Sequence, residues 1–274
     1  MRILIATGGA EHSSAALQLA GHIFQQQPDK FTAAILAVIK NETERLRAEK
    51  ILAQAGERLQ LSGLQLQTKI RVGHRAQEII AEATAGRYEL IIMGKRPSHR
   101  LKTRFLGSTA TRVMEHAPCP VIVAKGQPRP IHRILLCDSG VQSPSLLNRF
   151  MVNVAHIFSS KLEVTVLHVM SQISAGPGVT NHQLTAGADE LIQAHAPEGV
   201  LLVQDIETLQ QAGINAAPKV RHGLVVDEIL AEAHAGGFDL VVIGAYREGG
   251  WSLLLENLAR QIVSQIDCSV LVLR

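Results

Sequence analysis

The feature that most constrains this chain is an internal repeat, because four segments recur, with conservative changes, in the same order in its second half. The matching pairs are residues 2–5 with 133–136, 78–83 with 228–233, 88–94 with 238–244, and Cys119 with Cys268. Ordered recurrence over half of a 274-residue chain indicates two copies of one structural unit. We therefore predict two domains, residues 1–126 and 131–274, joined by the proline-containing linker 127–130.

The second copy contains additional residues. The first matching pair is offset by 133 − 2 = 131 residues and the second by 228 − 78 = 150, so 150 − 131 = 19 residues have been added between them. Ser, Gly, Pro and Asn are concentrated in residues 171–184, a composition typical of a long loop. We expect the insertion there, and its sequence indicates no function.

Apolar runs alternate with amphipathic segments throughout the first copy. The segments expected to form strands are residues 2–6, 31–39, 64–72, 88–93 and 121–124, and those expected to form helices are 11–27, 41–63, 76–85 and 107–114. Apolar residues at three- and four-residue intervals mark the helices, and apolar runs mark buried strands. Residues 64–72 instead alternate apolar and polar side chains, as a strand at or near a sheet edge does. Strands that alternate with helices form a parallel sheet covered on both faces. The predicted fold class of each copy is therefore α/β.

A basic loop separates the fourth predicted strand from the next helix. It runs from residue 94 to residue 109 and contains Lys95, Arg96, Arg100, Lys102 and Arg104. The helix that begins at Gly107, Ser108 and Thr109 directs free backbone N–H groups and the positive end of its dipole at this loop, an arrangement that can hold a phosphate. The alternatives are that the glycines and Ser108 are ordinary turn and cap residues, and that the cations are only solvated.

Composition excludes several classes of protein. Apolar residues make up 46% of the chain and charged residues 19%, which is enough to form cores and unlike a disordered protein. The formal net charge of +3 is too small to indicate a nucleic-acid partner. No run approaches the roughly 18 apolar residues of a membrane span. We expect a cytoplasmic protein with neither a nucleic-acid nor a membrane partner.

Cysteine and histidine patterns predict neither a metal site nor a catalytic one. Cys119, Cys137 and Cys268 form no CxxC pair, and none of the twelve histidines stands in an HExxH spacing. Ser108 lacks the GxSxG surroundings of a hydrolase nucleophile, and no general base stands beside the basic loop. We therefore assign no metal ligand and no catalytic residue.

Five landmarks together resemble the universal stress protein family: residues 3–7, 11–13, 71–73, 92–94 and 106–108. The resemblance covers almost the whole chain as two fused copies. It implies, in each copy, a flavodoxin-like doubly wound sheet with strand order 3-2-1-4-5. In single-copy members the fifth strands pair across a dimer axis. The resemblance thus implies that the two last strands pair within this chain about a pseudo-two-fold axis, and it leaves a further homodimer open.

The resemblance also implies a nucleotide site in the first copy. The signature of nucleotide-binding members is Gly, two residues, Gly, nine residues, Gly, then Ser or Thr, and here those positions hold Gly94, Pro97, Gly107 and Ser108. The implied cofactor is ATP or AMP, with Ala6 and Thr7 at the ribose and adenine, Val38 and Met93 at the base, and the helix start at the phosphates. The implied site residues are Ala6, Thr7, Gly8, Val38, Met93, Gly94, Arg96, Gly107, Ser108 and Thr109.

Several positions depart from this pattern. Gly8 stands where nucleotide binders have an acidic residue that holds the ribose, and Pro97 replaces the middle glycine and removes an N–H donor. In the second copy, Glu256-Asn257 falls at the Gly-Ser position and Asp138-Ser139 follows the first strand. A carboxylate repels phosphate, so we expect the second copy not to bind ATP in the family's way.

Three functions remain open on the sequence alone. The leading one is a non-enzymatic regulatory protein of the stress response, with an adenine nucleotide in the first copy, the second copy as its structural partner, and an unknown protein partner. The second is an interaction scaffold that binds no nucleotide. The third, a slow ATP hydrolase, ranks last because no general base is recognisable.

Overall fold

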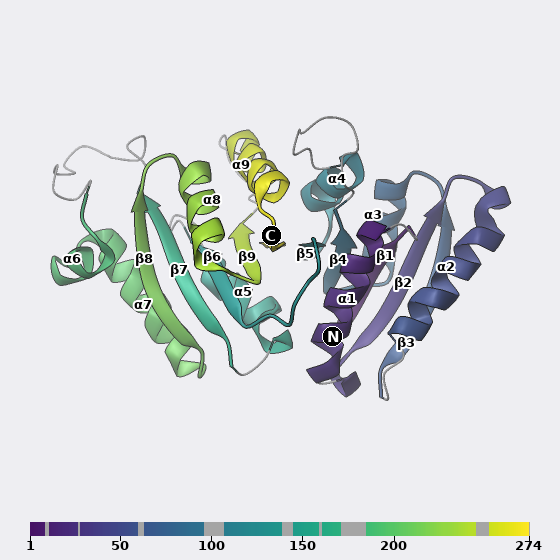
Figure 1. The fold of residues 1–274 in the computed structure, drawn as a ribbon, viewed down its shortest axis with the longest axis horizontal. Helices are drawn as coiled ribbons and strands as arrows, with labels where there is room; N and C mark the ends of the chain where they lie inside the picture. Colours follow the sequence, from purple (N-terminus) through teal and green to yellow (C-terminus); the bar gives the residue numbers. More distant parts are fainter. Residues whose placement is uncertain are drawn as a thin grey trace. The chain divides into compact units, whose positions relative to one another are not determined.

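The computed structural model describes residues 1–8, 11–26, 28–59, 63–95, 107–138, 145–158, 161–170, 185–244 and 252–273. Contacts divide the chain into two compact units, the first made of residues 1–130 and 245–274 and the second of residues 131–244. The C-terminal segment continues the second repeat in sequence but belongs to the first compact unit. Within each unit, strands and helices alternate along the chain (Figure 1).

Six of the described strands belong to the first unit. Its strands are β1 (Arg2–Thr7), β2 (Thr32–Ile39), β3 (Gln65–Val72), β4 (Leu90–Gly94), β5 (Val121–Ala124) and β10 (Ser269–Leu273). Its helices are α1 (Glu11–Gln26), α2 (Arg45–Arg58), α3 (Arg75–Ala85), α4 (Ser108–His116) and α9 (Ser252–Gln265), with short 3₁₀ turns at Pro28–Lys30 and Glu42–Glu44.

The strand order in this unit is β3-β2-β1-β4-β5-β10, with the first five strands parallel. This confirms the predicted order 3-2-1-4-5 of the first copy. The last strand, β10, runs antiparallel to β5 and places Val270 opposite Val123 and Val272 opposite Val121, as expected for the two last strands. The direction of winding reverses between β1 and β4, which is where ligands bind in open α/β sheets.

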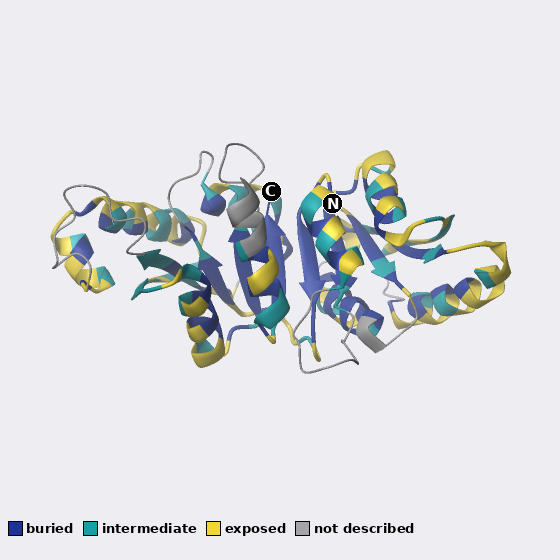
Figure 2. Cartoon of the chain, turned by 90° about the horizontal axis from the view of Figure 1, so that it is seen from above, coloured by how far each residue is buried: buried dark blue, intermediate teal, exposed yellow. Residues whose placement is uncertain are grey.

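Helices cover both faces of this sheet. α1 packs on β1 and β4, and α2 packs on β2 and β3, whereas α3 contacts α4. Right-handed connections place α1 and α2 on one face and α3 and α4 on the other. Ile3, Leu4 and Ile5 are consecutive and fully buried, which is expected only where both faces are covered. Figure 2 shows the central strands buried and the outward helix faces exposed.

The second unit repeats the same pattern. Its strands are β6 (Arg133–Cys137), β7 (Glu163–Met170), β8 (Asn215–His222) and β9 (Leu240–Gly244), and its helices are α5 (Leu146–Asn153), α6 (Ala188–Gln193), α7 (Pro197–Gln211) and α8 (Val225–Gly236), with a 3₁₀ turn at Ala155–Ile157. All four strands are parallel, in the order β9-β6-β7-β8.

The connection from β7 to α7 holds the extra length of the second copy. The proposed insertion at residues 171–184 lies outside the described residues. The same connection carries α6, a helix that the sequence did not predict. Leu191 of α6 packs with Ala186 and Ala196 against Met170 and Val220.

Asn41, the first residue of the predicted helix 41–63, caps a 3₁₀ turn and not the α-helix itself. Its side chain accepts a hydrogen bond from the N–H of Thr43 and caps the 3₁₀ turn Glu42–Glu44. If Asn41 capped the α-helix, the helix would begin at Glu42, but it begins three residues later, at Arg45. An Asn side chain that accepts a hydrogen bond from the N–H two residues further along the chain favours a tight turn before the α-helix.

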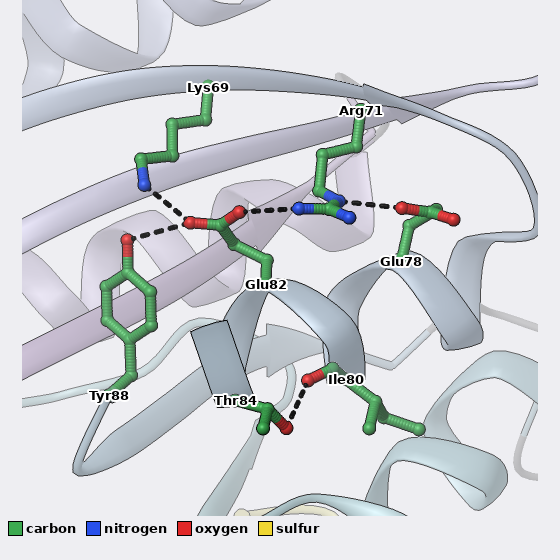
Figure 3. A network of polar contacts seen from close by, with 7 residues as sticks. All are labelled: Lys69, Arg71, Glu78, Ile80, Glu82, Thr84 and Tyr88. Atoms are coloured by element: carbon green, nitrogen blue, oxygen red, sulfur yellow. Dashed lines mark hydrogen bonds and ion pairs between the residues drawn. The ribbon is translucent and has the colours of Figure 1, made fainter. Parts of the chain in front are cut away.

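An ion network joins β3 to α3 in the first unit (Figure 3). The buried carboxylate of Glu82 accepts bonds from Lys69 at 2.6 Å, Arg71 at 3.0 Å and the hydroxyl of Tyr88 at 3.3 Å. Arg71 also bonds Glu78 at 2.6 Å. These contacts fix the outermost strand of the copy to the helix that follows it.

The second unit contains the same network with one member changed. Arg221 bonds Glu228 at 2.6 Å and Glu232 at 3.1 Å, at positions 150 residues beyond Arg71, Glu78 and Glu82 (221 − 71 = 150). Phe238 occupies the position of Tyr88 and offers no hydroxyl. The duplication thus extends from the strands to individual ion pairs.

Candidate functional site

The carboxyl ends of β1, β2 and β4 bring several of the proposed site residues together. Ala6 of β1 pairs with Met93 of β4, and Thr7 pairs with Ala37 of β2, next to Val38. Thr7 is buried, Met93 is 5% exposed and Val38 is half-buried. Met93 therefore belongs mainly to the core, whereas Val38 retains surface that a ligand can contact.

Gly8 follows β1 and has room beside it. Its N–H donates to the hydroxyl of the buried Ser13 on α1 at 2.9 Å. Among the described residues, a Cβ added to Gly8 would meet only that hydroxyl oxygen, at the ordinary contact distance of 3.9 Å, and the Gly8 backbone is not left-handed. In the sequence, Ser13 is only part of the landmark 11–13. Its hydrogen bond to Gly8 shows that it fixes the exit from β1.

The first turn of α4 supplies N–H donors at the same edge. α4 leads into β5, which is parallel to β4, so the helix begins at the edge where β4 ends. Gly107 is its N-cap, with φ −62° and ψ 147°, and no side-chain hydrogen bond caps this end among the described residues. Ser108 is exposed and Thr109 half-buried. The first turn of a helix has N–H groups without intrahelical partners, so this end suits an anion.

The basic residues near this turn are only partly described. Arg96, Arg100, Lys102 and Arg104, together with Pro97, lie outside the described residues. Lys95 is described, and its ammonium donates to the backbone carbonyl of Ser264 in α9 at 2.6 Å. Lys95 is therefore already engaged with a helix end.

The second copy places a carboxylate at the corresponding edge. Asp138 follows β6 and is 6% exposed, and its Oδ2 accepts a hydrogen bond from the N–H of Leu147 at 3.2 Å. Ser145 Oγ accepts another from Asn148. The start of α5 is thus capped by a buried carboxylate and a hydroxyl, which disfavours a second anion there. Glu256 and Asn257 are not described at side-chain level.

Asp205 of α7 is affected by the same carboxylate. Burial raises the pKa of this half-buried group, and the negative charge of Asp138 raises it further, to about 7. Since its folded pKa lies above the ordinary 3.8, ionising Asp205 opposes folding as the pH rises from about 4 through 7.

Replacing Asp205 by Asn is therefore expected to stabilise the protein at pH 8 and to change little at pH 4. A pKa shift from 3.8 to about 7 corresponds to ~4 kcal/mol of unfolding free energy. Because Asp205 is half-buried, solvent screening reduces the expected effect to about 1–2 kcal/mol. Urea unfolding of both proteins at the two pH values measures the difference. Glu207→Gln, at an exposed position of the same helix, is the control. An equal stabilisation at pH 4 would contradict the assignment.

Within the described residues, no cluster of three or more His, Cys, Asp or Glu side chains is arranged to hold a metal ion. The described helices likewise include none that is long and apolar enough to cross a membrane.

A doubly wound parallel sheet, with a helix N-terminus beside the point where the winding reverses, defines the flavodoxin-like class of α/β protein. The family model of the "Universal stress protein family" matches the chain twice, over residues 1–125 and 130–274. The chain belongs to this family, as a tandem member.

Individual relatives agree with this assignment. A universal stress protein from the QAH/OAS sulfhydrylase 3′ region of Thermus aquaticus is 29% identical over 138 residues, covering 45% of this chain and 97% of its own length. The universal stress protein YxiE of Bacillus subtilis is 27% identical over 145 residues, covering 45% of this chain and 98% of its own length. A crystal structure of a universal stress protein from Archaeoglobus fulgidus covers 100% of this chain and 98% of its own, with a TM-score of 0.75 and 17% identity. That structure shows that the shared fold extends over both copies.

Proposed function

We propose that this protein is a non-enzymatic regulator of the stress response whose first domain, residues 1–126, binds an adenine nucleotide, ATP or AMP. Membership of the universal stress protein family supports a role in the stress response. The observation that carries the nucleotide proposal is the first turn of α4, which begins at Gly107 beside the reversal point of the sheet and receives no side-chain cap from any described residue. Ala6, Thr7, Gly8, Val38 and Met93 would line the nucleoside side.

The proposed phosphate side comprises Gly94, Arg96, Gly107, Ser108 and Thr109. The second domain, residues 131–274, acts in this proposal as a structural partner, supported by the pairing of β10 with β5 and by the carboxylate cap on α5. A protein partner, a homodimer and a cytoplasmic location remain predictions.

Calorimetric titration of the full chain with ATP, AMP and cyclic AMP tests the proposal. Heat from at least one of these, saturating at one site per chain, is the expected result. Absence of heat with all three would favour the interaction scaffold. Phosphate release from ATP above a buffer control, lost in Ser108→Asn, would favour the hydrolase instead.

Restoring an acidic residue after β1 is expected to strengthen binding. The described residues leave room for a side chain beside Gly8, so Gly8→Asp should place a carboxylate where it can accept bonds from the ribose hydroxyls. A charge-assisted hydrogen bond is worth about 1.5–3 kcal/mol, so the affinity for ATP should rise roughly tenfold to a hundredfold. Gly8→Ala, which adds only the Cβ, should leave it unchanged. A weaker or equal affinity in Gly8→Asp would place the ribose elsewhere.

A further inference from the structure

Two lysines from neighbouring strands converge on one helix end in the first compact unit. Gly94 at the end of β4 pairs with Ala124 at the end of β5, and the residue that follows each strand is a lysine, Lys95 and Lys125. The ammonium of Lys125 donates to the carbonyls of Val263 and Ile266. The ammonium of Lys95 donates to the carbonyl of Ser264. We call these two residues, Lys95 and Lys125, the lysine clamp.

The strand directions explain why α9 ends at this place. β10 is antiparallel to β5, so the amino end of β10 lies beside the carboxyl end of β5. Because α9 leads directly into β10, its last turn lies at the edge where β4 and β5 finish. This is the same edge at which α4 begins.

The lysine clamp donates hydrogen bonds to carbonyl groups at the C-terminal end of α9. The last carbonyl groups of a helix have no intrahelical partner and carry partial negative charge, which cations stabilise. Lys125 is only 7% exposed, so its ammonium depends on these carbonyls for hydrogen bonds that water would otherwise supply. Lys95 is half-buried and therefore the more accessible of the two to solvent and to a ligand. Elsewhere on α9, Arg260 bonds Glu115 of α4 at 2.6 Å.

Lys95 also follows Gly94, the first residue on the proposed phosphate side. A phosphate oxygen accepts a stronger, charge-assisted hydrogen bond than a neutral carbonyl does. A phosphate bound at the start of α4 would therefore be a stronger acceptor for the ammonium of Lys95 than the carbonyl of Ser264.

We propose that Lys95 is shared between the proposed nucleotide site and the end of α9, so that nucleotide binding loosens the C-terminal helix. This inference rests on the proposed function. Lys125 keeps α9 attached when Lys95 moves, so the change is a fraying of the last turn and not a release of the segment. Since coupling between two sites is reciprocal, a tightly docked α9 also weakens nucleotide binding.

The corresponding position in the second copy cannot form this link. Residue 245, at 95 + 150, is Ala, which has no ammonium to share. The coupling therefore joins the proposed site of the first domain to the last helix of the second, with no counterpart built on residue 245.

Hydrogen exchange measured by mass spectrometry on the full chain tests this, with ATP at a concentration that calorimetry shows to be saturating. ATP should speed exchange in residues 258–266 of the wild type about tenfold, the change expected when a hydrogen bond from a charged group is lost. In Lys95→Met the same residues should exchange faster without ATP, and ATP should add nothing. Lys30→Met, which removes a charge at an exposed position, should behave as the wild type.

The outcomes separate this inference from the proposed function. ATP binding with unchanged or slower exchange in residues 258–266 would overturn the coupling and leave the nucleotide site standing. Unaltered exchange in ligand-free Lys95→Met would also overturn it. Absence of ATP binding in calorimetry would overturn the proposed function and the coupling together.

Discussion

Replacing Glu82 by Ala is expected to lower the free energy of unfolding by about 2–3 kcal/mol, the largest stability effect anticipated for this protein. The substitution leaves Lys69 and Arg71 without their shared carboxylate and the buried hydroxyl of Tyr88 without its acceptor. Removing one partner of a buried ion pair costs about 3–5 kcal/mol. The side chains of Lys69 and Arg71 are each 33% exposed, so water compensates for part of this loss.

The second copy provides a matched control within the same chain. Glu232 bonds Arg221 at 3.1 Å, but Lys219 lies 4.0 Å away and is 47% exposed, and Phe238 gives it no hydrogen bond. Glu232→Ala should therefore cost less, about 1–2 kcal/mol. Urea unfolding of both variants measures the difference. Equal losses would show that Lys69 and Tyr88 contribute nothing.

The effect of Glu82→Ala should also depend on pH. Burial by itself would raise the pKa of Glu82, but the bonds from Lys69, Arg71 and Tyr88 outweigh it, and the pKa is lowered from its ordinary 4.5. A carboxyl with a lowered folded pKa stabilises the protein above the unfolded pKa and loses that contribution as the pH falls through the folded value. The difference in unfolding free energy between the wild type and Glu82→Ala should be constant from pH 7 to about 5 and should decrease below 4.5.

Local sequence patterns predicted most of the first unit. Unbroken apolar runs predicted β4 and β5 to within two residues. These bounds follow from local hydrophobicity, which is visible in one dimension. The pairing of the two last strands was implied by the resemblance to the universal stress protein family, and the pairing of β10 with β5 confirms it.

Other features depend on contacts between distant residues and could not be predicted in this way. The partner of Lys125 lies 138 residues away, and a lysine in an apolar run does not reveal that its ammonium reaches a helix end. Asp138 was noted as a replacement, yet its bond to Leu147 could be found only in the structure. The short helix α6 lacked a long periodic pattern, and its buried Leu191 depends on β7 and β8 for its environment.

Replacing Gly107 by Glu is expected to abolish nucleotide binding without unfolding the protein. The backbone of Gly107 is in an ordinary extended conformation, so a larger residue can adopt it. A carboxylate at this helix start interacts favourably with the dipole, so α4 should be as stable as before or more so. The same carboxylate would lie beside the proposed phosphate, and two like charges about 4 Å apart in partly solvated surroundings repel by a few kcal/mol. We expect at least a hundredfold loss of affinity.

The central claim is that a duplicated unit keeps an anion site in its first copy alone, and the stoichiometry of ATP binding tests it most directly. Calorimetry should give one ATP per chain for the wild type, none for Gly107→Glu at unchanged melting temperature, and one for Glu256→Gln in the second copy. Two ATP per chain, or binding that survives in Gly107→Glu and disappears in Glu256→Gln, would contradict it.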